Sequence, residues 1–318
     1  MNATNSSHRE HPSGVRYAIG IDVGGTKIAG GLVQFPEGRV VVHQNVLTRP
    51  QRGPEAVLAD VEDMARQLRS AVPAGASLEA VGLGLCELVD REGNPASANC
   101  IDWRELPVRD RLSAIAPCCI EADVRAAALG EASFGAGQEF RLFLYVTIGT
   151  GISSCLMSEG KPFLGARGAT GTMASSPLPM ANEDEEAIMP TLEQLASGPA
   201  LVERFARLGG VAVSGEEVLA AACAGDTRAV GVVRSGAEAL GAAIGWLVNV
   251  LDPDAVVIGG GLGLSEGLFR DTLAASAHRH IWSDLHRDLP ILPAALASHA
   301  GIVGAAACAL NAQERIAR

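Results

Sequence analysis

Hydrophobic positions along this chain alternate between short apolar runs and longer stretches with helical spacing. Runs with the length and composition of buried strands lie at 17–22, 28–33, 80–85, 118–122, 143–148, 152–157 and 255–258. Stretches with helical spacing or Ala-rich composition predict helices at 54–71, 124–134, 192–208, 215–224, 226–250 and 301–316. Strands that alternate with helices in this way predict an α/β fold.

One strand–turn–strand unit occurs twice. The unit at 17–33 places two apolar runs around a glycine turn, and the unit at 143–157 does the same. This repeat predicts that the chain consists of two related halves. Residues 165–191, between the second unit and the later helices, show neither strand nor helix periodicity and contain an acidic run, so we expect an irregular loop region there.

Length and composition indicate two lobes with a ligand cleft between them. A chain of 318 residues exceeds one ordinary hydrophobic core, and 48% hydrophobic residues with 37 glycines are typical of tightly packed layers joined by glycine turns. The net charge of -11 argues against nucleic acid as a partner, because phosphate-backbone binding requires a concentrated basic face.

Targeting and metal-binding patterns are not found in the sequence. The first 14 residues are polar, and no 18 uncharged apolar residues run together, so we expect a cytoplasmic protein that does not bind membranes. Seven cysteines form no C-x-x-C pair and no Cys/His cluster with ligand spacing, so neither structural zinc nor a disulfide framework is expected.

The first candidate binding element is the turn Asp22-Val23-Gly24-Gly25-Thr26-Lys27. Paired glycines let the backbone turn its N–H groups toward an anion, and the Thr26 hydroxyl adds a donor. Asp22 could hold a magnesium ion through water. A plain hairpin turn is the alternative, since this pattern alone is common.

Two further glycine segments follow predicted strands. Gly149-Thr150-Gly151, at the start of the second half, again combines glycines with a threonine hydroxyl and could bind an anion in the same way. Gly259-Gly260-Gly261 leaves room for a flat base or ribose against the backbone. Neither the dinucleotide-binding G-x-G-x-x-G pattern nor a Walker motif is present, which disfavours both of those sites.

Asp123 is the candidate general base. It follows the predicted strand 118–122 and begins the helix at 124–134, and open α/β folds place reactive groups at such strand ends. Transfer of phosphate to an alcohol needs a group that accepts the hydroxyl proton, and a carboxylate can do this. The alternative is a simple helix cap.

Taken together these segments resemble the ROK family (repressor, open reading frame, kinase), whose kinases belong to the actin-like ATPase superfamily. The resemblance runs from about Tyr17 through nearly the whole chain. In order it rests on IGIDVGGTKIAGGLV, EADVRAAALGEASFGAG, VTIGTGI, LDPDAVVIGGGL and GIVGAAACAL. It implies a two-lobed actin-like (ribonuclease H-like) fold with a cleft. We expect a flexible tail at 1–14, a small lobe at 15–122 to which a helix at about 303–318 returns, and a large lobe at 123–302.

The resemblance also implies the role of each matching residue in an ATP-dependent sugar kinase. Those near phosphate, magnesium or adenosine are Asp22, Gly24, Gly25, Thr26, Lys27, Gly149, Thr150, Gly151, Gly260 and Gly261. Asp123 is implied to be the base, and the default product carries phosphate on a primary, 6-position-like hydroxyl. Repressor members carry an N-terminal DNA-binding domain, whereas about 16 residues precede the first strand here. Dimers or tetramers are expected by analogy.

The departures from the family lie in the sugar site. Where ROK kinases read G-E-x-G-H, this chain has Gly171-Thr172-Met173-Ala174-Ser175, and the zinc knuckle is replaced by the segment 189–192. Ala122 occupies the position of the Asn that usually precedes the catalytic Asp in the family. Asn99 and Glu193 remain as candidate sugar contacts. Three lost hydroxyl partners should weaken glucose binding strongly.

Glu87 is a new carboxylate in a loop that lines the sugar in relatives. We hypothesise that it contacts an ammonium or an extra hydroxyl, as on an aminosugar or cyclitol; a solvated loop residue is the alternative. The competing function is a degenerate ROK protein that binds sugar or nucleotide without turnover. Retention of Asp123 argues against it.

Overall fold

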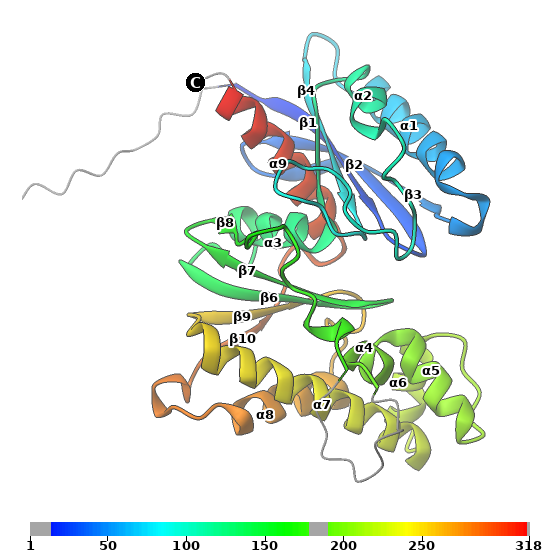
Figure 1. Ribbon diagram of the computed structural model, residues 1–318, viewed down its shortest axis with the longest axis vertical. Coiled ribbons are helices and arrows are strands. Elements are labelled where there is room, and N and C mark those ends of the chain that lie inside the picture. Colours follow the sequence, from blue (N-terminus) through cyan, green and yellow to red (C-terminus); the bar gives the residue numbers. More distant parts are fainter. Residues whose placement is uncertain (1–13, 178–189, 317–318) are drawn as a thin grey trace, which may run out of the picture.

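The computed structural model describes residues 14–177 and 190–316, which form two five-stranded sheets flanked by helices (Figure 1). The tail at 1–13, the acidic run at 183–186 and the chain end at 317–318 lie outside the described residues. No helix in the described ranges is long and apolar enough to cross a membrane.

The first sheet has the order β3-β2-β1-β4-β5. Its strands are β1 (Arg16–Val23), β2 (Lys27–Phe35), β3 (Arg39–Leu47), β4 (Leu78–Leu85) and β5 (Cys118–Ala122). The first three strands form an antiparallel meander, and β4 and β5 run parallel to β1. The edge strand β3 was not predicted from the sequence. It lies at a half-exposed edge, and its apolar residues are interrupted by the polar segment at 43–45.

The second sheet repeats this path with the order β10-β9-β6-β7-β8. Its strands are β6 (Leu142–Ile148), β7 (Ile152–Ser158), β8 (Lys161–Pro162), β9 (Ala255–Gly259) and β10 (Ile291–Pro293). Again an antiparallel meander comes first, and the two later strands lie parallel to its first strand. The shared topology agrees with the two related halves predicted from the repeated strand–turn–strand unit.

Helices cover the sheets and lie between them. Those associated with the first sheet are α1 (Pro54–Ser70), α2 (Val108–Ser113), α3 (Asp123–Phe134) and α9 (Ala300–Ile316). The others are α4 (Leu192–Ala196), α5 (Gly198–Arg207), α6 (Gly215–Cys223), α7 (Thr227–Leu251) and α8 (Leu268–His280). The single helix predicted at 192–208 is two helices, because the Ser197 hydroxyl accepts the Ala200 N–H and starts α5 anew.

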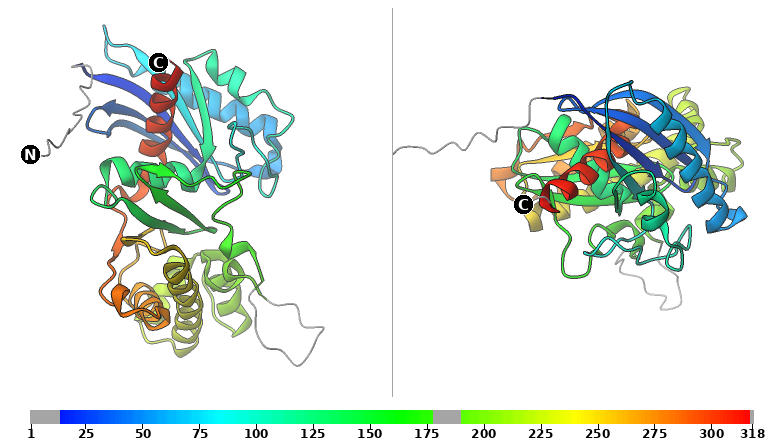
Figure 2. Two further views of the ribbon diagram at one scale, coloured as in Figure 1. Left: turned by 60° about the vertical axis from the view of Figure 1, so that its left-hand side comes forward. Right: turned by 90° about the horizontal axis from the view of Figure 1, so that it is seen from above.

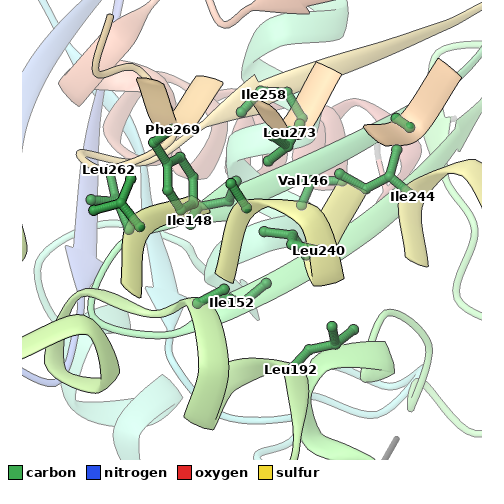
Figure 3. Close-up of a cluster of buried hydrophobic side chains, with 14 of the residues drawn as sticks. Val146, Ile148, Ile152, Leu192, Leu240, Ile244, Ile258, Leu262, Phe269 and Leu273 are labelled. Carbon is green, nitrogen blue, oxygen red and sulfur yellow. The ribbon is translucent and has the colours of Figure 1, made fainter. Parts of the chain in front are cut away.

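A large apolar core lies between the second sheet and the helices beneath it (Figure 3). Val146 and Ile148 on β6 face Leu240 and Ile244 on α7, and Phe269 on α8 fills the space beside them. These side chains are almost completely excluded from solvent. The core therefore fixes the ends of β6 and β9, from which two of the glycine turns project.

The C-terminal helix α9 returns to the first sheet and lies beside α3 (Figure 2). Glycines permit the close approach: a Cβ atom on Gly82 of β4 would lie 1.8 Å from the Ala305 carbonyl oxygen, and one on Gly304 would lie 1.7 Å from the Ala126 carbonyl oxygen. Backbone thus packs directly on backbone between the two sheets. The lobe boundaries at 15–122 and 123–302 stay a prediction.

Gly304→Ala is expected to destabilise the protein, because the added methyl must push α3 and α9 apart, at a cost of about 1–3 kcal/mol or more. Gly231 on α7 is the matched control, since a Cβ atom there meets nothing within 4 Å. Gly231→Ala should stabilise by roughly 0.5–1 kcal/mol. Urea unfolding of both variants measures this, and equal effects would contradict the packing argument.

Candidate active site

The turn at 24–26 joins β1 to β2 and is held rigid by hydrogen bonds. The Gly24 N–H donates to the Lys27 carbonyl at 3.0 Å, and the buried Thr48 hydroxyl donates to the Gly24 carbonyl at 2.6 Å. The Thr48 N–H also donates to the Thr26 carbonyl. Thr26 and Lys27 themselves are exposed, so their side chains are available to a ligand.

The turn at 149–151 joins β6 to β7 and lies against the first turn. The two threonine hydroxyls, Thr26 Oγ1 and Thr150 Oγ1, are 3.3 Å apart. The Gly149 N–H donates to the Gly151 carbonyl, and the Gly149 carbonyl accepts the Gly198 N–H from the start of α5. The structure therefore brings together the hairpin turns of both sheets.

The third glycine segment adjoins the second turn. A Cβ atom on Gly149 would lie 3.9 Å from the Gly261 nitrogen. Gly260 has a φ of +81°, and a Cβ atom there would lie 2.3 Å from the Ile148 carbonyl oxygen, so only glycine is accommodated. The predicted adenosine segment therefore continues directly from the predicted phosphate turn.

Asp123 is the first residue of α3, immediately after β5, and its carboxyl group is half-buried. Ala122 occupies the N-cap position, and no side chain makes an N-cap hydrogen bond to this helix. The Asp123 Oδ1 atom accepts the Val124 N–H at 2.6 Å, which fixes the carboxyl group at the helix start.

Asp22 and Asp123 border the same glycine. Gly84 on β4 pairs with Asp22 on β1, and a Cβ atom on Gly84 would lie 3.5 Å from both Asp22 Oδ1 and the Asp123 Cα. The first turn of α9 packs on the other side of Asp22, where a Cβ atom on Gly301 would lie 2.4 Å from Oδ2. Because β1, β4 and β5 are parallel, both acids lie at the carboxyl ends of these strands, on the same side of the sheet.

This crowding shifts the acidity of both groups. Burial, together with the charges of Asp22 and Glu87, raises the pKa of Asp123 to about 7, against the lowering effects of the Val124 N–H and the Arg125 guanidinium. Burial raises the pKa of Asp22 to about 6, opposed by the Lys27 ammonium. A carboxylate with a pKa near neutrality is suited to proton abstraction.

Glu87 is buried, with 4% of its surface exposed, and both of its oxygens are engaged. Oε2 accepts the Ser97 hydroxyl and the Asn99 N–H, and Oε1 accepts the Cys100 and Ile101 N–H groups. Four donors saturate a carboxylate. Glu87 is therefore neither a solvated loop residue nor free to contact an ammonium: it orders the loop at 97–101.

The remaining predicted substrate residues lie around these turns. The Asn99 side chain is exposed on the loop that Glu87 holds, and a Cβ atom on Gly25 would lie 3.3 Å from the neighbouring Cys100 sulfur. Glu193 on α4 accepts the Ile152 N–H through Oε2 at 2.9 Å, directly beside Gly151. Thr172 is exposed and starts the 3₁₀ turn at 173–175, behind Gly171, which packs on Ser154 of β7.

The match to known proteins extends over almost the whole chain. The ROK family model matches residues 18–312. The chain belongs to the ROK family. It is 31% identical to a glucokinase of Streptomyces coelicolor over 91% of this chain and 96% of that protein. It is also 28% identical to the kanosamine kinase of Amycolatopsis mediterranei, over 93% and 97% respectively.

A solved ROK structure confirms the fold. The ROK glucokinase of Streptomyces griseus, crystallised with glucose and AMPPNP, superposes with a TM-score of 0.78 and 30% identity over 93% of this chain and 99% of that one. The α/β architecture with two lobes of the actin-like type is therefore established for this ROK chain.

A hollow of about 350 Å³ lies elsewhere, between β3 and α1. It is lined by residues such as Gln44, Arg49 and Asp60, none of which the ROK resemblance assigns to the site. Within 14–177 and 190–316, no group of three or more His, Cys, Asp or Glu side chains is arranged to hold a metal ion. The expected lack of structural zinc stays a prediction.

Sequence reasoning missed two residues that shape the site. Thr48 fixes the first turn from the end of β3, a strand that had not been predicted. Arg125 is buried beside Asp123 although it is an arginine in an Ala-rich helix. A charged residue on the buried side of a predicted helix was the available signal for it.

Proposed function

We propose that this protein is an ATP-dependent sugar kinase that phosphorylates a primary, 6-position-like hydroxyl on an aminosugar or cyclitol ring rather than on plain glucose. One observation carries the proposal. Asp123, with a pKa near neutrality, lies close to Asp22 at the carboxyl ends of neighbouring strands, and the glycine turn after Asp22 contacts the second glycine turn. The resemblance to kinases along their full length supports it.

The residues of the two turns bind and orient the nucleotide. The hydroxyls of Thr26 and Thr150 hold the phosphates, together with backbone N–H groups of the two turns other than those of Gly24 and Gly149, which donate within their own turns. Gly260 and Gly261 leave room for the adenosine. Lys27, exposed beside the first turn, adds positive charge.

Asp22 supplies hard carboxylate oxygens at the same point, which suits a magnesium ion held directly or through water. Bound Mg²⁺ would neutralise charge on the transferred phosphate. The raised pKa of Asp22 is consistent with this role, because an unpaired half-buried carboxylate gains a partner when a cation arrives.

Asp123 accepts the proton of the substrate hydroxyl while that oxygen attacks the γ-phosphorus and ADP departs. The product is the sugar phosphate, and the proton is released from Asp123 afterwards. Binding at the ring is assigned to Asn99, Thr172 and Glu193, which lie on segments next to the two turns.

The substrate class follows from the altered sugar segment. Thr172 and Ser175 stand where the resemblance places Glu and His, so glucose hydroxyls lose charged or aromatic-ring partners. The relative named kanosamine kinase supports an aminosugar. Since Glu87 is saturated by its loop, selectivity for such a ring comes from the loops and not from that carboxylate.

A turnover assay tests the proposal. ADP formation is measured with hexoses, aminosugars and cyclitols, with Asp123→Asn as the blank. Turnover of at least one aminosugar or cyclitol above glucose is the expected result. Ligand binding without turnover above the blank would replace the proposal with the degenerate, binding-only function.

The rate is expected to depend on pH through Asp123. Because the base must be ionised and its pKa is raised to about 7, kcat/KM for the sugar should fall tenfold per pH unit below that value. The measurement is a pH–rate profile from 5.5 to 9. A profile flat down to pH 5.5 would show that Asp123 titrates near its ordinary value.

Cytoplasmic location, the absence of nucleic-acid or membrane partners, and a dimer or tetramer remain proposals from the sequence and the ROK resemblance. Light scattering of the purified chain measures the oligomeric state directly.

A further inference from the structure

Arg125 is a buried cation two residues after Asp123, with 2% of its surface exposed. Its Nε donates to Glu121 Oε1 at 2.6 Å, its Nη1 to the Gly168 carbonyl at 2.9 Å, and its Nη2 to the Val89 carbonyl at 2.6 Å. A buried guanidinium is retained only where its charge and its donors are matched. Every nitrogen of this group has such a partner.

These partners come from three separate segments. Glu121 is on β5, Val89 is on the loop that follows β4, and Gly168 is on the loop between β8 and the 3₁₀ turn at 173–175. The second and third segments extend from opposite sheets. Arg125 is therefore a link between loops of the two halves.

The two loops meet in direct backbone contact beside the guanidinium. Gly168 has a φ of +74°, and a Cβ atom on it would lie 2.4 Å from the Val89 carbonyl oxygen and 2.8 Å from the Asp90 Cα. The Gly168 and Val89 carbonyl groups at this contact each need a donor, and Arg125 supplies one to each, Nη1 to Gly168 and Nη2 to Val89.

The same loops carry the candidate sugar contacts. The loop after β4 contains Glu87, which orders Asn99, and the other loop leads through Gly171 to Thr172. We propose that Arg125 is a positioning residue that clasps these two loops together and so sets the width of the sugar-binding side of the site. This inference rests on the proposed function for its effect on substrate binding.

An arginine is required because its planar group presents donors in several fixed directions at once. A lysine at this position keeps the charge but offers one compact ammonium, which cannot reach Glu121, Val89 and Gly168 in their present places. Arg125→Lys should therefore recover part of the function that Arg125→Met loses.

The experiment compares Arg125→Met, Arg125→Lys and the double variant Glu121→Gln/Arg125→Met. The matched control is Arg111→Met, which removes a guanidinium between α1 and α2 whose hydrogen bonds go to Glu62, at 2.8 Å, and to Glu55. Sugar KM, ATP KM and kcat are measured with the best substrate of the panel. Hydrogen exchange of 86–101 and 165–172 is followed by mass spectrometry, with α8 as the internal reference.

Arg125→Met is expected to raise the sugar KM about tenfold or more, since two carbonyl groups lose their donor, while ATP KM changes little. Exchange in both loops should be faster and exchange in α8 unchanged. The double variant should keep the raised KM, which shows that the clasp matters beyond its pairing with Glu121. Arg111→Met should leave the sugar KM unchanged.

An unchanged sugar KM, or restoration of KM in the double variant, overturns the proposal. So does unchanged exchange in the two loops, whatever the turnover. If the wild-type chain phosphorylates no sugar and Arg125→Met still loosens both loops, the kinase function fails while the clasp itself stands.

Discussion

Asp123→Asn is expected to lower kcat by roughly a thousandfold, within the range that a positioned general base contributes. The amide is nearly the same size as the carboxyl group and keeps an oxygen to accept the Val124 N–H, so the start of α3 should not change. What it cannot do is take a proton from the sugar hydroxyl. Single-turnover kinetics with saturating ATP and sugar measure the chemical step directly.

The same variant should be more stable than the wild type at pH 8, which separates lost chemistry from lost folding. The folded-state pKa of Asp123 is raised to about 7 from 3.8, so ionisation weakens the folded state as pH rises between those values. Removing the charge relieves that cost. The gain in Tm should be largest at pH 8 and shrink toward pH 4.

Two results would contradict this account of Asp123. If kcat falls by less than tenfold, another group accepts the proton. If ATP affinity falls along with kcat, the residue serves nucleotide binding and not proton transfer. Asp63→Asn on the exposed face of α1 is the control, because its carboxylate contacts only Arg66 and should alter neither quantity.

Glu87→Gln is expected to lower kcat/KM about a hundredfold for every accepted sugar alike. The amide has one oxygen and one donor group, so its NH₂ would face N–H groups that now donate to a carboxylate oxygen. Each unmet buried donor costs about 1–3 kcal/mol, enough to release the loop at 97–101. That loop carries Asn99 and lies against Gly25.

The pattern across substrates is the informative measurement. Direct recognition of an ammonium by Glu87 predicts a loss confined to aminosugars, whereas loop ordering predicts a uniform loss over the panel. Glu92→Gln is the matched control, since Glu92 is exposed on the segment between Glu87 and the 97–101 loop. A selective effect would restore the direct-contact hypothesis that the hydrogen bonds of Glu87 contradict.

The local sequence pattern was sufficient to predict most helices and strands and the types of residue at the candidate site. Strands β1, β2, β6 and β7 were predicted because apolar runs on both sides of a glycine turn can form little else. Asp123 was found for a similar reason, since a carboxylate that ends a buried strand is a local feature. The edge strand β3 and the short helix α2 lack such a pattern and were missed.

The sequence by itself determined the chemistry that the chain can offer: glycine turns with threonine hydroxyls, two acids at strand ends, and the altered segment at 171–175. Tertiary structure decided which of these groups meet. The 3.3 Å contact of Thr26 with Thr150 joins residues 124 positions apart, and no local pattern specifies such a distance.

Tertiary structure also decided what a charged residue does. In the sequence, Glu87 and Arg125 are charged residues next to apolar ones, and either could have been solvated. Burial forces each to find partners among backbone groups of distant loops, because an unmatched charge inside a protein is too costly to keep. That requirement makes Glu87 and Arg125 the supports of the loops around 97–101, Val89 and Gly168.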